Sequence, residues 1–313
     1  ILDKSARRNY QNYQKFHALL YKSTFRKQKP HWLNGLSRHT FQNRKQTLVI
    51  NHPLAVDMSD KETLLPKGKG VWIPIDHGVS DFPVNGLENL DELIEAISHA
   101  DAIVAQKGVV SHYCSSNVNF VAHLSVSTRH AGERSSDKML VGSVEEALSR
   151  GAKGVSVQVN MGSPDEPEMI ERLGVITQDS HFLNCPVLGM IYPRGENLDI
   201  MEGDDTNAAA HAARLAFELG CDVVKTKWTG SVESFRKVTS CVPIPVLIAG
   251  GPAGATTEET LTTVHKAMQA GGGGVCMGRQ VFSHPNPKAM VSALKAIIHD
   301  GSSVEKAMQE YGL

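Results

Sequence analysis

The residue in this chain best suited to covalent chemistry is Lys225. It lies at the end of a short apolar stretch, Val223 to Thr226, which follows a helix-like segment that ends at Gly220. A lysine at the end of a buried parallel strand is either a solvated charge or a desolvated amine at the mouth of an α/β barrel. We interpret it as the desolvated amine, because a neutral amine can attack a carbonyl carbon and form a Schiff base.

Lys227 follows two residues later, so on a strand both lysines face the same way. Burial and a neighbouring cation both lower the pKa of a lysine, and this would give Lys225 the neutral amine that the attack needs. Lys227 could be that cation, or it could simply be solvated near the rim. We favour the solvated interpretation.

Two other residues have side chains that support carbonyl chemistry. Tyr192 could donate and accept a proton during carbinolamine formation or carbon–carbon cleavage, although a tyrosine in a strand often only packs its ring. Asp76 could hold the lysine or take the proton of a substrate hydroxyl, and a structural ion pair is an equally good interpretation. Because both follow predicted strands, as Lys225 does, their joint occurrence favours a catalytic site.

Strands and helices alternate along the chain from Gly70 onward. The predicted strands are 71–76, 102–105, 119–124, 154–159, 186–191, 223–226, 245–249 and 275–277, and the predicted helices are 87–98, 144–149, 166–183, 206–219, 232–238, 258–269, 288–299 and 304–311. Little helix is predicted between the second and third strands. Eight such repeats predict an α/β fold, a (β/α)8 TIM barrel, with its chemistry at the C-terminal ends of the strands.

Glycines and cations also follow the predicted strands. Gly250 and Gly251 come after the seventh strand, and Gly278 and Arg279 come after the eighth. Barrels often bind phosphate there through backbone N–H groups and the N-terminus of a short helix, and an arginine would add a charged fork. The remaining candidates for substrate binding are Lys107 and His123, as acceptor contacts, and Arg194.

The first 66 residues differ in composition from the rest. Residues 1–46 hold eleven Lys or Arg and one acid, although the whole chain has a net charge of −1. We predict a basic N-terminal helical extension over 1–66 and a barrel over 67–313. The extension could be a helical arm that packs on the barrel or on a neighbouring subunit, a targeting remnant, or a nucleic-acid arm, and we favour the packing arm.

Composition also limits cofactors and location. The five cysteines are scattered without a CxxC pair, which favours a reducing, cytoplasmic compartment. No cluster has metal-ligand spacing, so we expect no metal and no cofactor. No apolar stretch approaches the ~18 residues of a membrane span, and the near-neutral charge gives no global reason to bind nucleic acid.

Taken together, these motifs resemble the class I aldolases of the DeoC and archaeal-type fructose-bisphosphate aldolase family, from about Gly70 to the end of the chain. The resemblance rests on Ile75 to Gly78, Met190 to Gly195, Val224 to Thr226 with Thr229-Gly230, Ile248 to Pro252 and Met277 to Arg279. It implies that Lys225 forms the Schiff base, Tyr192 is the acid/base and Asp76 their partner. Phosphate binding around Gly251, Gly278 and Arg279 is also implied, as is a homo-oligomer such as a decameric ring.

Within the family, the stretches 76–80, 106–108 and 123–125 look closest to synthases that join a keto-phosphate-derived fragment to aspartate semialdehyde. Met190 stands where the fructose-bisphosphate enzymes carry tryptophan, and the usual Gly-Pro of the first loop is here Phe82-Pro83. We therefore expect a metal-independent aldolase or transaldolase. Its partners would be dihydroxyacetone phosphate or a phosphorylated keto sugar, and an aldehyde such as aspartate semialdehyde.

Three alternatives remain open from the residues alone. The first is a fructose-1,6-bisphosphate aldolase, which cleavage of that sugar would reveal. The second is a thiolase-like acyl transferase, which would depend on coenzyme A. The third belongs to another class: a non-catalytic phosphosugar-sensing barrel with a basic interaction arm, which would bind a ligand without turnover.

Overall fold

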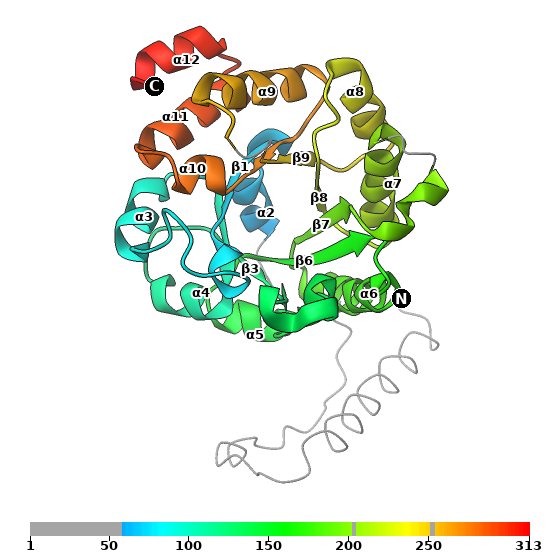
Figure 1. Ribbon diagram of the computed structural model, residues 1–313. Helices are drawn as coiled ribbons and strands as arrows, with labels where there is room; N and C mark the ends of the chain where they lie inside the picture. Colours follow the sequence, from blue (N-terminus) through cyan, green and yellow to red (C-terminus); the bar gives the residue numbers. More distant parts are fainter. Residues whose placement is uncertain (1–57, 202–204, 251–253) are drawn as a thin grey trace, which may run out of the picture. The chain divides into compact units, whose positions relative to one another are not determined.

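The computed structural model describes residues 58–201, 205–250 and 254–313, and its sheet is a closed barrel of parallel strands (Figure 1). Around the barrel the strands are β1 (Gly70–Pro74), β2 (Ala102–Gln106), β3 (Phe120–His123), β6 (Gly154–Met161), β7 (Val187–Pro193), β8 (Val223–Thr226), β9 (Val246–Ala249) and β10 (Gly274–Cys276). The predicted (β/α)8 TIM barrel is thereby confirmed. The strands are short and parallel, so their C-terminal ends meet at one rim.

Helices form a ring around this barrel (Figure 1). They are α3 (Leu90–Ile97), α4 (Lys107–Tyr113), α5 (Val144–Ser149), α6 (Glu166–Leu183), α7 (Asp205–Glu218), α8 (Val232–Ser240), α9 (Thr257–Gln269), α10 (Arg279–Phe282), α11 (Pro287–Ile298) and α12 (Val304–Tyr311). The single turn α10 was not predicted, and α4 occupies an interval where little helix was expected. Helix α4 buries only Val110, so its sequence lacks the apolar periodicity that identifies a helix.

Side chains that alternate along each strand form two apolar layers, one inside the barrel and one between the barrel and its helices. Trp72, Leu188 and Val223 belong to the layer inside the barrel, whereas Val224 packs in the layer between the barrel and its helices. Successive side chains of a strand point to opposite faces, so Lys225 points inward like Val223. The lysine thus enters the barrel because of its register in β8.

Helix α2 (Met58–Leu64) closes the N-terminal end of the barrel and lies at the centre of the ring in Figure 1. Leu64 and Leu65 join the inner layer, and the Trp72 indole Nε1 donates to the Leu64 carbonyl over 2.8 Å. The end of the predicted N-terminal extension therefore packs on the barrel floor. Residues 1–57 lie outside the described part of the chain, so the arm and the boundary after residue 66 stay predictions.

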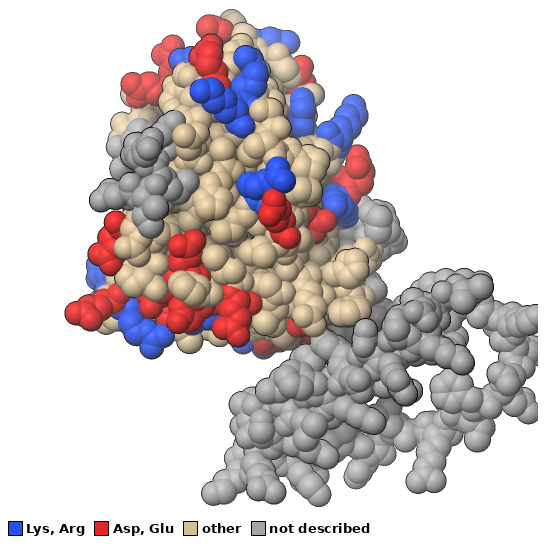
Figure 2. Space-filling view, turned by 90° about the vertical axis from the view of Figure 1, so that its right-hand side faces the viewer, with Lys and Arg blue, Asp and Glu red and all other residues tan. Residues whose placement is uncertain are grey.

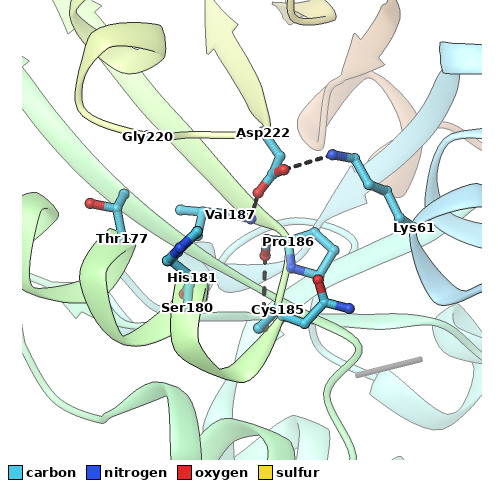
Figure 3. A pocket seen from close by; sticks show the side chains of 10 residues that line it. Lys61, Thr177, Ser180, His181, Cys185, Pro186, Val187, Gly220 and Asp222 are labelled. Atoms are coloured by element: carbon cyan, nitrogen blue, oxygen red, sulfur yellow. Dashed lines mark hydrogen bonds and ion pairs between the residues drawn. The ribbon is translucent and has the colours of Figure 1, made fainter. Parts of the chain in front are cut away.

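Two aspartates that precede strands tie neighbouring strands together at this end. Asp222 accepts a hydrogen bond from Val187 N at 3.0 Å and pairs with Lys61 Nζ at 2.7 Å, beside a small pocket (Figure 3). It thereby fixes the starts of β7 and β8, the strands that carry Tyr192 and Lys225.

Asp101 does the same for β1 and β2. Its Oδ2 accepts from Val71 N at 2.7 Å and contacts His299 Nε2 at 2.6 Å, while its Oδ1 pairs with Lys295 Nζ at 3.0 Å. Burial raises the pKa of Asp101, but the hydrogen bonds that it accepts lower it below the ordinary value. The carboxylate therefore stabilises the fold at neutral pH, and this contribution is lost as the pH falls through the lowered pKa.

Figure 2 shows one face of the barrel, on which acidic and basic side chains lie among uncharged ones and the basic side chains visible there form no extended patch. Among the described residues, no helix combines the length and the apolar character needed to cross a bilayer.

We predict that Asp101→Ala lowers the free energy of unfolding by about 2–3 kcal/mol, because a buried N–H, the Lys295 ammonium and the His299 ring lose their partner. Urea unfolding at pH 7 measures the change. The control is Asp300→Ala, at an exposed acid, where a change below about 0.5 kcal/mol is expected. Equal stability of the two variants would contradict this role.

Candidate active site

A pocket of about 410 Å³ lies at the C-terminal ends of the strands. Residues from β1, β6, β7, β8, β9 and β10, or from the loops that follow them, line it. The predicted site residues that it brings together are Asp76, Tyr192, Arg194, Lys225, Gly250, Gly278 and Arg279. The barrel thus assembles in one pocket residues that are separated by up to two hundred positions in the sequence.

Lys225 lies deepest among the charged groups of this pocket and is 6 % exposed. Its register neighbours are Met190 on β7 and Leu247 on β9, both buried in the inner layer. Its Nζ lies 5.8 Å from the centre of the Tyr192 ring. The amine therefore has apolar walls below it and a phenol above it.

The charge state of Lys225 differs from the expectation. Burial lowers the pKa of this amine, but its acidic neighbours Cys276, Tyr192 and Asp76 raise it more, so the pKa lies above the ordinary value. Burial raises the pKa of the Cys276 thiol to about 11, so this thiol is uncharged at neutral pH. The Asp76 carboxylate is then the ionised group among these neighbours, and its charge raises the pKa of Lys225 without a direct ion pair in the described structure.

The expected lowering of this pKa is therefore wrong for the ligand-free site. The groups that face the amine are acids rather than a second cation. Lys227 does not supply one, because its Nζ pairs with Asp205 Oδ1 at the start of α7, at 2.5 Å. Lys227 and Asp205 form an exposed ion pair, which agrees with the favoured interpretation of Lys227 as a solvated residue near the rim.

Asp76 begins a 3-10 turn directly after β1. Its Oδ2 lies 3.7 Å from His123 Nε2 and its Oδ1 lies 3.9 Å from His77 Nδ1. Burial raises the pKa of Asp76, but the two histidines and Lys225 lower it below the ordinary value. Asp76 is therefore ionised at neutral pH and links the lysine to the histidines.

His123 lies behind Asp76 and does not line the pocket. It is 3 % exposed, and burial lowers its pKa to about 4, which leaves the imidazole neutral at pH 7. Its Nδ1 hydrogen-bonds with Ser156 Oγ at 2.8 Å, and its Nε2 lies 3.4 Å from Ser125 Oγ. His123 thus supports Asp76 and has no place from which to contact an acceptor directly.

Tyr192 and Arg194 come from the end of β7. The Arg194 guanidinium lies over the Tyr192 ring, 4.6 Å from its centre, and donates from Nε and Nη2 to Asn160 Oδ1 at 2.9 and 2.7 Å. Gln158 Nε2 donates to the same oxygen at 2.8 Å. This network holds the Arg194 guanidinium against the tyrosine ring.

The predicted phosphate cradle is formed by the ends of β9 and β10. Gly278 precedes α10, and a Cβ placed there would lie 2.5 Å from the Pro74 carbonyl oxygen, so only glycine fits without a backbone shift. Arg279 is exposed at the pocket mouth, and within the described chain no carboxylate pairs with it. Gly250 lines the pocket, whereas Gly251 lies outside the described residues. The predicted cradle therefore provides the Arg279 guanidinium and, at the glycines, backbone without a side chain of its own.

Lys107 is not in this pocket. It is the first residue of α4, and its Nζ donates to the Val141 carbonyl at 2.5 Å and to Glu146 Oε1 at 3.1 Å. The sequence does not show which partner a strand-end cation will find. Its partner Glu146 is 39 positions away in the sequence, in the predicted helix 144–149.

Sequence reasoning also missed several lining residues. Cys276, Gln158 and His77 line the pocket, and each belongs to a predicted strand or its end, so its alternating register is the signal that could have found it. Among the described residues, no group of three or more potential ligands could hold a metal ion.

Comparison with known proteins places this geometry in a family. The model of the DeoC/LacD family aldolases matches residues 71–284. The 2-amino-3,7-dideoxy-D-threo-hept-6-ulosonate synthase of Halobacterium salinarum is 41 % identical over 246 residues, which cover 77 % of this chain and 91 % of that protein. The 2-amino-4,5-dihydroxy-6-oxo-7-(phosphonooxy)heptanoate synthase of Streptomyces griseus is 38 % identical over 236 residues, which cover 74 % and 85 %.

Solved structures that resemble this chain are aldolases as well. An archaeal fructose 1,6-bisphosphate aldolase superposes with a TM-score of 0.69 at 28 % identity, covering 78 % of this chain and 99 % of that one. Another archaeal fructose-1,6-bisphosphate aldolase, whose catalytic lysine is covalently bound to the carbinolamine intermediate, has a TM-score of 0.68 at 28 % identity, covering 77 % and 98 %. The chain therefore belongs to the DeoC/LacD family of aldolases, and the predicted enzyme class, a class I aldolase-type enzyme, is confirmed with it.

Proposed function

We propose that this enzyme joins a phosphorylated keto fragment to an amino-acid aldehyde through a Schiff base on Lys225. The observation that carries the proposal is the buried Lys225 amine, which shares a pocket with the Asp76 carboxylate and the Tyr192 ring and with Arg279 at the mouth. An amine, an acid/base and an anion site are the groups that this chemistry requires.

The reaction begins when the Lys225 ammonium loses a proton, and Asp76 is the anion in place to accept it or to pass it to solvent. The Nζ lone pair then bonds to the donor carbonyl carbon while the carbonyl oxygen takes a proton, which gives a carbinolamine. Loss of water gives an iminium, and loss of an α-proton from the iminium gives an enamine. Tyr192 carries protons in these steps.

The enamine carbon then attacks the aldehyde carbon of the acceptor, and the aldehyde oxygen takes a proton. A new carbon–carbon bond and an iminium of the longer chain result, and water releases the product from Lys225. Arg279 and the backbone at Gly250 and Gly278 bind the donor phosphate and so hold the reacting carbon near the amine.

The names of the two synthases support the choice of acceptor. Each product name has a ketone at the sixth carbon, an amino group at the second and a carboxylate at the first. An aldol disconnection between the fourth and fifth carbons leaves a four-carbon amino-acid aldehyde, which is aspartate semialdehyde. For the phosphorylated product the other fragment is dihydroxyacetone phosphate.

A fructose-1,6-bisphosphate aldolase is the second candidate, and the structural likeness to such enzymes favours it. Cleavage of that sugar, compared with condensation of aspartate semialdehyde, separates the two. The proposal also includes a cytoplasmic, homo-oligomeric enzyme, on the grounds of the scattered cysteines and the family resemblance.

We predict that borohydride with dihydroxyacetone phosphate modifies Lys225. Reduction of the imine adds a hydride and a proton, so intact mass rises by the donor mass less one oxygen atom, and peptide mapping locates the adduct. Lys225→Met should abolish the adduct, and Lys227→Met should keep it. An adduct on Lys227, or none in the wild-type protein, would reject the assignment.

We predict that Asp76→Asn shifts the pH dependence of adduct formation to lower pH by about one to two units, because the anion that raises the pKa of Lys225 is removed. Below that pKa the neutral amine, and with it the rate of trapping, increases with pH. The midpoint of the rate profile is measured rather than its height. Asp81→Asn, at an exposed rim acid paired with Arg129, should leave the midpoint unchanged, and an unshifted Asp76→Asn profile would refute the pairing.

We predict that Arg279→Gln raises the KM for dihydroxyacetone phosphate about 10- to 100-fold, because a charged hydrogen-bonding group is lost. The KM for unphosphorylated dihydroxyacetone should change little. The control is Lys288→Gln, at an exposed cation of α11. An equal effect on both donors would contradict a phosphate contact.

A further inference from the structure

A second pocket of about 480 Å³ adjoins the lysine pocket, and Arg194 lines both. The Asn160 side chain lies in the wall between them, because its Oδ1 accepts from Gln158 on one side and from Arg194 on the other. Arg194 in turn lies over the Tyr192 ring. A molecule in the second pocket would therefore lie next to the reacting end of the donor.

Lys138 is a cation of this pocket that the proposed chemistry has not yet used. Burial and the nearby Arg194 lower the pKa of its amine. Among the described residues no carboxylate lies within ion-pair distance of it, although Asp76 attracts it from further away. Neither Lys138 nor Arg194 forms an ion pair with a carboxylate of the described residues, so the two side-chain cations together favour an anion.

The backbone at Lys138 is firmly held. The preceding Asp137 is 2 % exposed and pairs with Arg134 and with Arg172 of α6. Arg172 Nη1 also donates to the Lys138 carbonyl at 2.9 Å. The amine is therefore presented from a fixed base, which is what a specific binding site requires.

Ser163 supplies an independent sign of a ligand. It lines the same pocket and is 6 % exposed, yet its Oγ has no hydrogen-bond partner in the described protein. A buried hydroxyl without a partner is costly, and a bound ligand is one of the few explanations for it. The exposed acids Glu133 and Glu196 also line the pocket.

From this arrangement we infer that the second pocket binds the amino-acid head of the acceptor aldehyde. The carboxylate lies against Lys138, Arg194 and the Ser163 hydroxyl, and the ammonium lies toward Glu133 and Glu196. The aldehyde end then extends past Arg194 toward the Lys225 enamine. This inference rests on the proposed function, and it replaces Lys107 and His123 as the acceptor contacts.

Lys138→Met and Ser163→Ala test it, with Lys237→Met at an exposed position of α8 as the matched control. Calorimetry measures the binding of homoserine, which has the same head as aspartate semialdehyde and a hydroxyl in place of the aldehyde. We expect Lys138→Met to weaken homoserine binding about 10- to 100-fold and to raise the KM for aspartate semialdehyde by a similar factor. Ser163→Ala should weaken both about threefold to tenfold without lowering the melting temperature.

Two further readouts separate this inference from the proposed function. Propionaldehyde has no charged head, so its KM should be the same in Lys138→Met as in the control. Failure of the wild-type protein to trap a donor on Lys225 would overturn the proposed function. Normal trapping, combined with an unchanged affinity for homoserine in Lys138→Met, would overturn the acceptor site alone.

Discussion

An ammonium group among the apolar side chains of a barrel is stable only if an anion lies beside it, because the cost of removing the charge from water must be offset. Here that anion is Asp76, which lines the same pocket as Lys225 and raises the pKa of its amine through its charge rather than through a direct ion pair in the described structure. Val223, Met190 and Leu247 exclude water below the amine, while His123 and its serine partners support the carboxylate from behind. The rest of the barrel fixes the positions of these two groups relative to each other.

This pairing changes the account of how the lysine becomes a nucleophile. The neutral amine is not present in advance, since the pKa of Lys225 is raised rather than lowered. Binding of the donor and removal of one proton must therefore be coupled. An arriving carbonyl displaces the ammonium from its anion, and the lost proton has the acidic groups of the pocket, Asp76 and Tyr192, as its neighbours. The proposed donor phosphate site belongs to the pocket of Lys225, and the proposed acceptor site belongs to the adjoining pocket that shares Arg194 with it.

Much of the fold could be predicted because local signals agreed. Helices α5, α6 and α12 have the predicted bounds. The Ser143 and Ser303 side chains cap α5 and α12, whereas α6 has a proline in its first turn and ends at Asn184 in the left-handed conformation. Lys225 and Tyr192 were identifiable because strand alternation directs them inward. Lys138 was not identifiable, because it lies in a loop whose position depends on Asp137 and Arg172. Lys107 was misplaced for a similar reason: only the tertiary structure shows that Glu146 holds it.

The central claim is that a carbon of the donor becomes bonded to the Lys225 nitrogen beside a bound phosphate. A crystal structure of the enzyme soaked with dihydroxyacetone phosphate tests this most directly. The account predicts continuous density from Lys225 Nζ to the second carbon of the donor, with the phosphate between Gly250, Gly278 and Arg279. A donor bound with its carbonyl away from this amine, or density joined to another lysine, would contradict it.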